Sequence, residues 1–454
     1  MQTRDTFGSR LGVIFATVGC AVGLGNIWRF PYMLGSNGGA AFLLIYFLCA
    51  LLLGLPVMIA EFYIGRHSRR NAVGAFKAIV PKTGWAVIGY NGVLAAFIIL
   101  GFYSVISGWT FEYVFQSVTD SFTGKSVNDF ESEFLLFSSG TFRPLFWALL
   151  FIFITHFIVT SGVKKGIERF SKLLMPVLFV ILVVLCIRSV TLPGAMSGLA
   201  FLFAPDFGKI DSSVLLSAMG QAFFSLSVGM GCLITYSSYF GDKTNLQSTA
   251  LQVAIIDTFI AVLAGIMIFP AVFSFGIEPA AGVELVFITL PNVFSKLPLG
   301  NLWACIFFLL LSVAALTSTI SLHEVATAYL HEERHISRKK AAYCVSSGVI
   351  VLAVLSSLSF GILKDFTVFG LTIFDFLDYV TAKLMLPLGG MFICIFVGWR
   401  IDKKILKAEL TNRGTATFYF FGVYSILLKY AAPVAIAFIF LNELGLINII
   451  QTVF

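Results

Sequence analysis

The chain consists of long hydrophobic runs that are separated by short polar segments. A helix needs about 20 apolar residues to cross a bilayer, and eleven runs come close to that length or exceed it. Their predicted bounds are 11–34, 40–65, 85–118, 142–160, 168–187, 213–240, 246–275, 299–330, 340–358, 367–398 and 417–446. Lipid admits only helices or closed barrels, and these runs are much longer than barrel strands. The pattern therefore predicts an all-α polytopic membrane protein with eleven transmembrane helices.

Composition agrees with this class. Hydrophobic residues make up 58% of the 454 residues and charged residues only 12%, whereas soluble domains carry about 25% charged residues. The first run has Asn26 and Arg29 where a signal peptide would be apolar, and it has no small-residue cleavage site, so we expect it to be retained. The seven cysteines all fall in apolar segments. We interpret them as small core residues, with neither a disulfide framework nor a metal site.

The positive charge is distributed unevenly among the predicted loops. Of the 30 Lys and Arg residues, 21 fall in one set of alternating loops, which starts with the N-terminus, and 6 fall in the other set. Cytoplasmic loops of membrane proteins carry the excess of Lys and Arg. We therefore expect residues 1–10 to be cytoplasmic and, with eleven helices, the C-terminus to lie outside the plasma membrane. The net charge of +7 is then a signal of topology, and no nucleic-acid partner is expected.

Two of the runs carry glycines at their midpoints. The first contains AVGLG (21–25) and the sixth contains SVGMG (227–231), which share the pattern V-G-x-G. Each glycine destabilises a helix by about 1 kcal/mol relative to alanine, so we expect both helices to be broken there. Breaks at corresponding places in two inverted halves are typical of secondary transporters and mark the binding site. Close helix packing through Gly19 and Gly23, a GxxxG pattern, is the alternative.

Polar groups inside the predicted spans are the next candidates for function, because ionisable residues are costly in a membrane. The eighth helix also carries a cluster of hydroxyl groups in LTSTIS (316–321), where Thr317 and Ser318 share a helical face with Ala314. The ionisable residues within spans are Arg29, Glu61, Glu112, Asp257, Glu324, Asp375, Asp378 and Lys383.

A short motif offers an alternative of another class. HEERH (331–335) matches H-E-x-x-H, the signature of zinc metalloproteases. It lies where the eighth helix enters a basic loop, and no Cys, His or Asp cluster stands out as a third ligand. We therefore interpret it as a charged helix end and expect the protein not to be an enzyme.

Four stretches together resemble the neurotransmitter:sodium symporter family, and its bacterial amino-acid branch in particular. They are GCAVGLGNIWRFPY (19–32), NGGAAFLLIY (37–46), QAFFSLSVGMG (221–231) and LTSTISLHEVATAYL (316–330). The resemblance covers essentially the whole chain. It implies a leucine-transporter-type fold with a five-helix repeat over 11–187, an inverted repeat over 213–398 and an eleventh helix over 417–446. It also implies sodium-coupled symport by alternating access.

The resemblance further implies two sodium sites, one substrate site and two gates. The first sodium site would comprise Ala21, Asn26, Ser225 and Asp257, together with the substrate's carboxylate. The second would comprise Gly19, Val22, Ala314, Thr317 and Ser318. The substrate would contact Ala21, Gly23, Gly25, Ile99, Tyr103, Ile106, Phe224, Ser227, Met230, Ser318 and Leu322. Arg29 with Asp378 would form the outer gate, and Arg4 with Glu332 the inner gate.

Two positions refine the expected substrate and ions. Relatives that carry monoamines have aspartate at the position of Gly23, so glycine there implies an amino acid, and the apolar pocket implies hydrophobic L-amino acids, both aliphatic and aromatic. Asp257 stands where the family usually has asparagine. Its carboxylate would replace the chloride that dependent relatives bind near Tyr46, Gln221 and Ser225, so chloride is not expected to be required. A proton-coupled permease of the same fold, with Asp257 or Glu61 titrating, is the alternative. The preferred amino acid and the oligomeric state are left open.

Overall fold

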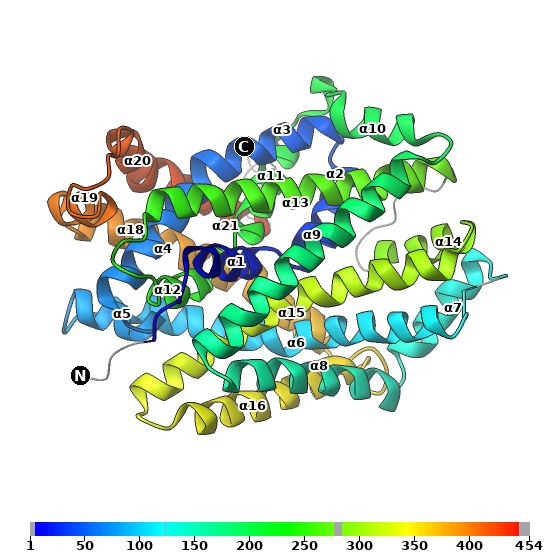
Figure 1. Ribbon diagram of the computed structural model, residues 1–454, viewed down its shortest axis with the longest axis horizontal. Helices are drawn as coiled ribbons and strands as arrows, with labels where there is room; N and C mark the ends of the chain where they lie inside the picture. Colours follow the sequence, from blue (N-terminus) through cyan, green and yellow to red (C-terminus); the bar gives the residue numbers. More distant parts are fainter. Residues whose placement is uncertain (1–4, 123, 277–283, 445–454) are drawn as a thin grey trace.

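The computed structural model describes residues 5–122, 124–276 and 284–444, and these segments are almost entirely helical (Figure 1). The α-helices are α1 (Arg10–Ala21), α2 (Phe30–Ser36), α3 (Ala40–Cys49), α4 (Leu55–Ser68), α5 (Ala72–Ile79), α6 (Ala86–Val118), α7 (Val127–Ser138), α8 (Phe142–Thr160), α9 (Arg169–Val190), α10 (Ala195–Phe203), α11 (Ser212–Ser225), α12 (Cys232–Ser237), α13 (Leu246–Ser274), α14 (Leu290–Ser295), α15 (Gly300–Glu333), α16 (Arg338–Leu358), α17 (Ile373–Asp378), α18 (Leu386–Ile395), α19 (Lys403–Leu410), α20 (Phe421–Ile426) and α21 (Ala432–Glu443).

Several helical segments contain a wider π-helical turn that adjoins an α-helix directly. These turns are η1 (Gly25–Arg29), η2 (Ala50–Gly54), η3 (Val163–Glu168), η5 (Leu285–Thr289), η6 (Tyr379–Met385), η7 (Phe396–Arg400) and η8 (Leu427–Ala431), and η4 (Phe207–Lys209) is a 3-10 turn. The described segments contain no strand, only an isolated bridge between Val368 and Leu371.

The described helices include nine segments that are long and apolar enough to cross a membrane. They are Ala40–Ser68, Ala86–Val118, Phe142–Thr160, Val163–Val190, Leu246–Ser274, Gly300–Glu333, Arg338–Leu358, Ile373–Arg400 and Phe421–Glu443. A further span consists of Arg10–Ala21 and Gly25–Ser36, which are bent by 55° at a break. The predicted helix 213–240 is divided into α11 and α12, each too short to cross alone. The chain is a multi-pass membrane protein, and these elements are consistent with the eleven predicted helices.

Five short helices lie outside the predicted spans, namely α5, α7, α10, α14 and α19. The hydrophobic pattern did not predict them because they are too short to form a membrane-length run. Side-chain caps start some of them: Ser126 and Asp129 form a capping box on α7, and the Asn71 side chain accepts from the backbone at the start of α5.

The two longest helices, α6 and α15, pack against each other through the middle of the molecule (Figure 1). The broken first span is held inside, where α1 contacts α9, α13 and α15. Small residues permit close approach of the helices. A Cβ at Gly108 of α6, for example, would lie 2.5 Å from the backbone of Ala148 in α8. The first span is therefore surrounded by protein, and its irregular backbone is shielded from lipid.

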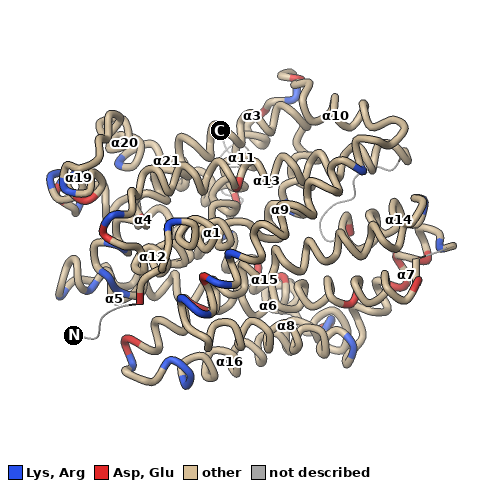
Figure 2. The backbone as a smooth tube through the Cα atoms, in the orientation of Figure 1, with Lys and Arg blue, Asp and Glu red and all other residues tan. Residues whose placement is uncertain are grey.

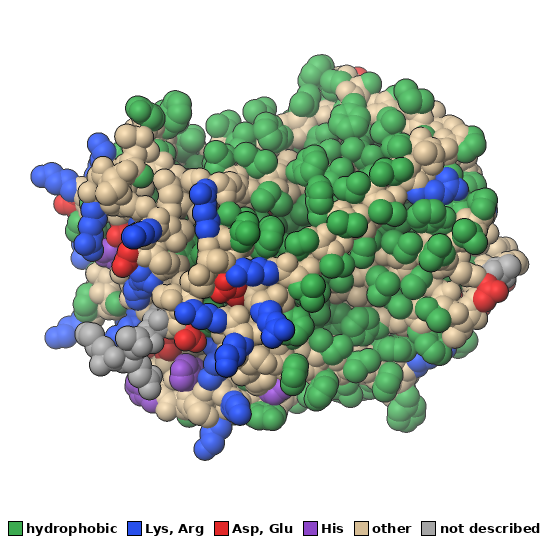
Figure 3. All heavy atoms as spheres, in the orientation of Figure 1, with side chains coloured by type: hydrophobic (Ala, Val, Ile, Leu, Met, Phe, Trp, Pro, Cys, Tyr) green, Lys and Arg blue, Asp and Glu red, His purple; other side chains and the backbone are tan. Residues whose placement is uncertain are grey.

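One end of the molecule is basic. Lys and Arg are concentrated where the N-terminus, α5, α12 and α19 lie, and hydrophobic side chains cover most of the remaining face (Figures 2 and 3). The described segment before α1 is held at this end, because Phe7 N–H donates to Tyr239 O at 3.0 Å and Gly8 N–H donates to Glu168 Oε2 at 2.6 Å. The segment before α1 thus closes over α12 and η3.

The short helix α19 is anchored at the same end by a buried arginine. Arg66 Nε donates to Glu409 Oε1 at 2.6 Å, and the guanidinium also donates to Asn412 Oδ1 at 2.8 Å. Burial alone would raise the pKa of Glu409, but the hydrogen bond to His67 and the charge of Arg66 lower this pKa to about 2. The Glu409 carboxylate is therefore ionised at neutral pH and keeps α19 against α4.

Candidate functional site

The first span is interrupted at residues 22–24. Gly23 N–H donates to Asn26 Oδ1 at 3.1 Å, instead of to the Gly19 carbonyl that it would bond in a continuous helix. Leu24 N–H donates to Tyr103 Oη at 3.0 Å. A Cβ at Gly23 would lie 2.4 Å from Ser318 Oγ and 3.0 Å from Tyr103 Oη, so only glycine allows this close approach. The predicted break is present.

The second break occupies residues 226–231, between α11 and α12. Ser227, Gly229 and Gly231 have positive φ angles of 54°, 87° and 72°, a conformation that glycine adopts without steric cost. Ser227 is the exception, and its Oγ donates to the carbonyl of Cys20 at 3.0 Å. Gly229 N–H donates to Glu61 Oε1 at 2.7 Å. The second break is therefore hydrogen-bonded to the end of α1, next to the first break, and to α4.

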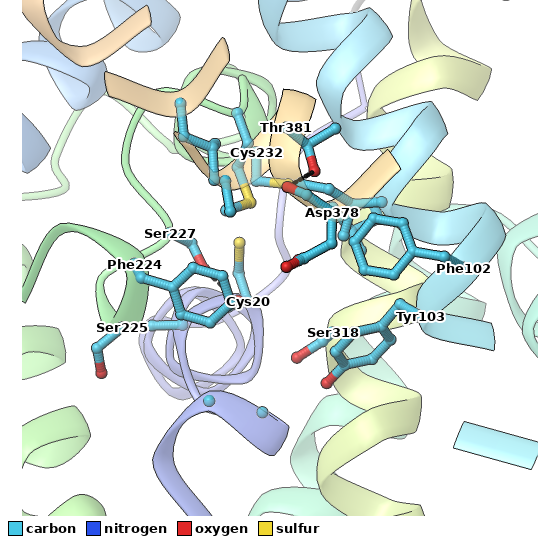
Figure 4. A pocket seen from close by; sticks show the side chains of 18 residues that line it. Cys20, Phe102, Tyr103, Phe224, Ser225, Ser227, Cys232, Ser318, Asp378 and Thr381 are labelled. Atoms are coloured by element: carbon cyan, nitrogen blue, oxygen red, sulfur yellow. Dashed lines mark hydrogen bonds between the residues drawn. The ribbon is translucent and has the colours of Figure 1, made fainter. Parts of the chain in front are cut away.

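A cavity lies between the breaks (Figure 4). Ten of the eleven predicted substrate residues line it; Ile106 is buried but is not among the lining residues. The sequence interpretation missed a wall that is formed by η6 and its neighbours. The additional lining residues are Cys20, Phe102, Ser225, Cys232, Asp378, Thr381, Ala382 and Leu386.

Three of the residues expected at the first sodium site form one buried hydrogen-bonded cluster. Asn26 Nδ2 donates to Asp257 Oδ1 at 2.8 Å, and Ser225 Oγ donates to Asp257 Oδ2 at 2.7 Å. Tyr46 Oη also donates to Asp257 Oδ2, at 3.4 Å. Ala21, the fourth expected residue, lines the adjoining cavity. The cluster is thus placed beside the space where a substrate carboxylate would lie.

Asp257 differs from two other buried acids, which are held in ion pairs. Glu112 is paired with Arg143, and Glu324 is paired with Arg338. The ion pairs formed within residues 5–122, 124–276 and 284–444 include none with Asp257, whose side chain is fully buried. An ionised carboxylate without a cation is costly away from water. The site therefore favours binding of a cation or a proton.

The residues expected at the second sodium site also meet. Thr317 Oγ1 lies 3.4 Å and Ser318 Oγ 3.3 Å from the carbonyl oxygen of Val22. Thr317 Oγ1 also lies 2.8 Å from the Ala314 carbonyl, and a Cβ at Gly19 would lie 3.2 Å from Thr317 Cβ. Hydroxyl and carbonyl oxygens from α1, its break and α15 therefore converge, which is a donor set suited to a hard cation.

Among the predicted gate residues, Arg29 and Glu332 contact residues other than their expected gate partners. The Arg29 guanidinium lies 4.0 Å from the ring centroid of Phe224, and Arg29 and Asp378 line a second cavity without an ion pair among the described contacts. At the basic end, Glu332 Oε2 accepts from Asn71 N–H at 2.9 Å and from Asn71 Nδ2 at 3.0 Å. Arg4 lies outside the described residues.

The HEERH segment does not have the geometry of a metalloprotease. Helix α15 ends at Glu333, and His335 has a positive φ of 54°, so the two histidines do not share one helical face as the motif requires. The His331 ring instead contacts the carbonyl of Ile336 at 2.6 Å. Within the described part of the chain, no group of three His, Cys, Asp or Glu residues is suited to a metal ion.

Comparison with known proteins gives consistent matches over the full length. The family model described as "Sodium:neurotransmitter symporter family" matches residues 4–133 and 125–452. The sodium-dependent transporter YhdH of Bacillus subtilis is 38% identical over 97% of this chain and 98% of its own length. A sodium-dependent transporter of Haemophilus influenzae is 39% identical over 98% and 99%. Among solved structures, MhsT in complex with L-phenylalanine matches with a TM-score of 0.89 and 46% identity, over 97% of this chain and 100% of that chain.

Proposed function

Since the chain belongs to the sodium:neurotransmitter symporter family, we propose that it is a sodium-coupled secondary active symporter that imports hydrophobic L-amino acids by alternating access. Two of its relatives are named sodium-dependent transporters, and a structure that is 46% identical contains L-phenylalanine. The family transports solutes and is not a family of enzymes.

The observation that carries the sodium proposal is the buried carboxylate of Asp257. Among the described residues, the groups that donate hydrogen bonds to it are neutral, namely Asn26, Ser225 and Tyr46. A sodium ion held by Ala21, Asn26, Ser225 and Asp257 would balance its charge with oxygen ligands, which hard cations prefer. A second ion would be held by Gly19, Val22, Ala314, Thr317 and Ser318.

The cavity supports an amino acid with an apolar side chain. Around the breaks it presents backbone of Gly23 and Gly25 and the Tyr103 hydroxyl, which suit a carboxylate. Its remaining wall is mostly apolar, with Ile99, Phe224 and Leu322 among the lining residues. Met230 also lines it, and a flexible thioether adapts to side chains of different shape. We therefore propose aliphatic and aromatic substrates.

The Asp257 carboxylate also supports independence from chloride. Its Oδ2 contacts both Ser225 and Tyr46, where the resemblance would place the anion of chloride-dependent relatives. A fixed negative charge at this place makes a second anion unfavourable, because like charges repel at short distance.

We propose the orientation of the chain in the membrane from the distribution of its Lys and Arg residues. The basic end, with residues 1–10, would be cytoplasmic, and the C-terminus would be extracellular. The helices within 11–187 and 213–398 would then be the two inverted repeats, followed by the helix in 417–446. Each repeat would contribute one broken span to the cavity.

Proton coupling is the second candidate, and it is favoured by one further observation. Glu61 is fully buried, and its Oε2 accepts no hydrogen bond within the described chain. A proton on Glu61 or on Asp257 would remove the uncompensated charge without sodium.

Uptake into proteoliposomes separates these candidates. Labelled leucine, phenylalanine and tryptophan are offered with an inward sodium gradient, or with choline in place of sodium at constant pH on both sides. Sodium coupling gives accumulation only with sodium. Accumulation in choline that is driven by an imposed pH gradient would overturn the proposal in favour of the proton-coupled permease.

A further inference from the structure

Two cysteines face each other at the cavity, one from each broken span. Cys20 lies in the last turn of α1, and Cys232 is the first residue of α12. Both are free thiols, and both line the cavity. Figure 4 shows the two sulfur atoms pointing toward one another. Both residues are buried, as expected for small core residues, whereas Cys344 is exposed and does not fit that interpretation.

We propose that Cys20 and Cys232 form a binding site for a soft d10 metal ion that takes two sulfur ligands. Thiolates select soft ions, and the thiolate is the form that binds a metal. With Hg²⁺ as the example, two S–Hg bonds form and each thiol releases one proton to solvent. The resulting dithiolate carries no net charge, so it can be buried without the cost that an unpaired ion would have.

The surroundings of the pair restrict which ions fit. The described residues supply no third His, Cys, Asp or Glu to complete a group around these thiols. Ions that require four ligands, such as structural Zn²⁺, would therefore be held poorly. The site is built for coordination number two. Access is provided by the cavity itself, because both side chains line it while they are shielded from lipid.

A bound metal ion would join the inner parts of the two broken spans. Both α1 and α12 lie at the basic end of the molecule (Figures 1 and 2), and Cys20 and Cys232 are the residues at which each of them reaches the cavity. A link between the two sulfurs would keep α1 and α12 together. The substrate could then not leave the cavity toward the basic end of the molecule. This consequence rests on the proposed function, whereas the binding itself does not.

The test uses full-length protein in which the two more accessible cysteines are replaced, Cys344→Ser and Cys305→Ser, because both are at least partly exposed. Purified protein is incubated with one equivalent of Hg²⁺ and desalted, and the retained mercury is measured by elemental analysis and by its thiolate absorption in the ultraviolet. We expect about one mercury per chain. Cys20→Ser and Cys232→Ser should each reduce retention at least tenfold, and the double variant should be no lower than either single one.

The matched control is Cys186→Ser, which replaces another buried thiol that is not among the residues lining the cavity and should retain mercury fully. Equal retention by the parent and both single variants, or no retention by the parent, would overturn the site. Uptake in proteoliposomes is measured in parallel, relative to the untreated form of each variant. Mercury should reduce it at least tenfold in the parent, and a dithiol chelator should restore it.

Retained mercury with unchanged uptake would overturn the inference that a metal ion bound to Cys20 and Cys232 blocks transport by linking α1 and α12. Retained mercury in a protein that shows no sodium-driven uptake before treatment would instead contradict the proposed function and leave the metal site established. The two failures are therefore distinguishable.

Discussion

Replacement of Asp257 by asparagine tests the charge argument most directly. The substitution keeps the approximate size of the side chain, which Asn26 and Ser225 now contact at 2.8 and 2.7 Å. It removes the negative charge and replaces one acceptor oxygen by an N–H donor, so the Ser225 hydroxyl, which now donates to Oδ2, would accept from the amide instead. Because this charge has no basic partner among the described ion pairs, its loss leaves no other ion unpaired.

The expected magnitude follows from Coulomb's law. With charge centres about 4 Å apart and an effective dielectric constant of about 20, a sodium ion is attracted by about 4 kcal/mol, which corresponds to a factor of about 1,000 in affinity. The amide oxygen of asparagine is still a ligand and compensates in part. We expect the sodium concentration for half-maximal uptake to rise between about 100- and 1,000-fold.

The assay measures uptake of labelled leucine against sodium concentration, at constant ionic strength with choline as the replacing cation. Glu112→Gln is the control, because it also removes one buried negative charge, but from a carboxylate that is paired with the half-exposed Arg143; it should leave the sodium dependence unchanged. A change of less than threefold in Asp257→Asn would refute the assignment of this carboxylate to the sodium site.

Four further predictions follow from the geometry. Gly23→Ala should reduce uptake at least tenfold, since its Cβ would lie 2.4 Å from Ser318 Oγ, whereas Gly422→Ala, with open space around it, should transport normally. Replacing chloride with gluconate should leave wild-type uptake unchanged, and Asp257→Asn should gain stimulation by chloride; a large loss in the wild type would contradict this. Trp147→Phe removes the donor to Glu112 Oε2 at 2.6 Å and should lower the unfolding temperature in detergent by an amount that corresponds to about 1–3 kcal/mol. The pKa of Glu409 is lowered to about 2, whereas the pKa of glutamate in an unfolded chain is about 4.3. The ionised Glu409 carboxylate therefore contributes its full stabilisation above about pH 4.3, and this stabilisation is lost as the pH falls toward 2. Glu409→Gln should show no such loss in an acid titration of unfolding.

The sequence predicted the parts of the fold that depend on local chemistry. Membrane-length runs identified the spans, and clustered glycines at 19–25 and 227–231 predicted where two of them break, because a glycine weakens a helix wherever it stands. The short helices in the loops were not predicted, since their starts depend on single caps such as Asn71 and Ser126.

Only part of the site could be predicted, because some of its residues have no local signal in the sequence. The family motifs named ten residues that line the cavity, yet the wall from Thr381 to Leu386 and the pair Cys20 and Cys232 were missed. These residues have no local signal; they reach the cavity only because distant helices pack there. The expected gate of Arg29 and Asp378 stays a prediction. In the structure, the Arg29 guanidinium lies on the Phe224 ring.

The hydrogen bonds that the second break makes with the first half of the chain bear on how the protein is made. Ser227 is held in its left-handed conformation by a carbonyl of the first span, and Gly229 N–H bonds Glu61 of the second. Each half of the chain thus supplies the partners that the other half needs at mid-membrane. During synthesis the first half enters the bilayer before the second. Until the second half is inserted and docks, the Cys20 carbonyl and the Glu61 carboxylate lack these hydrogen-bond donors.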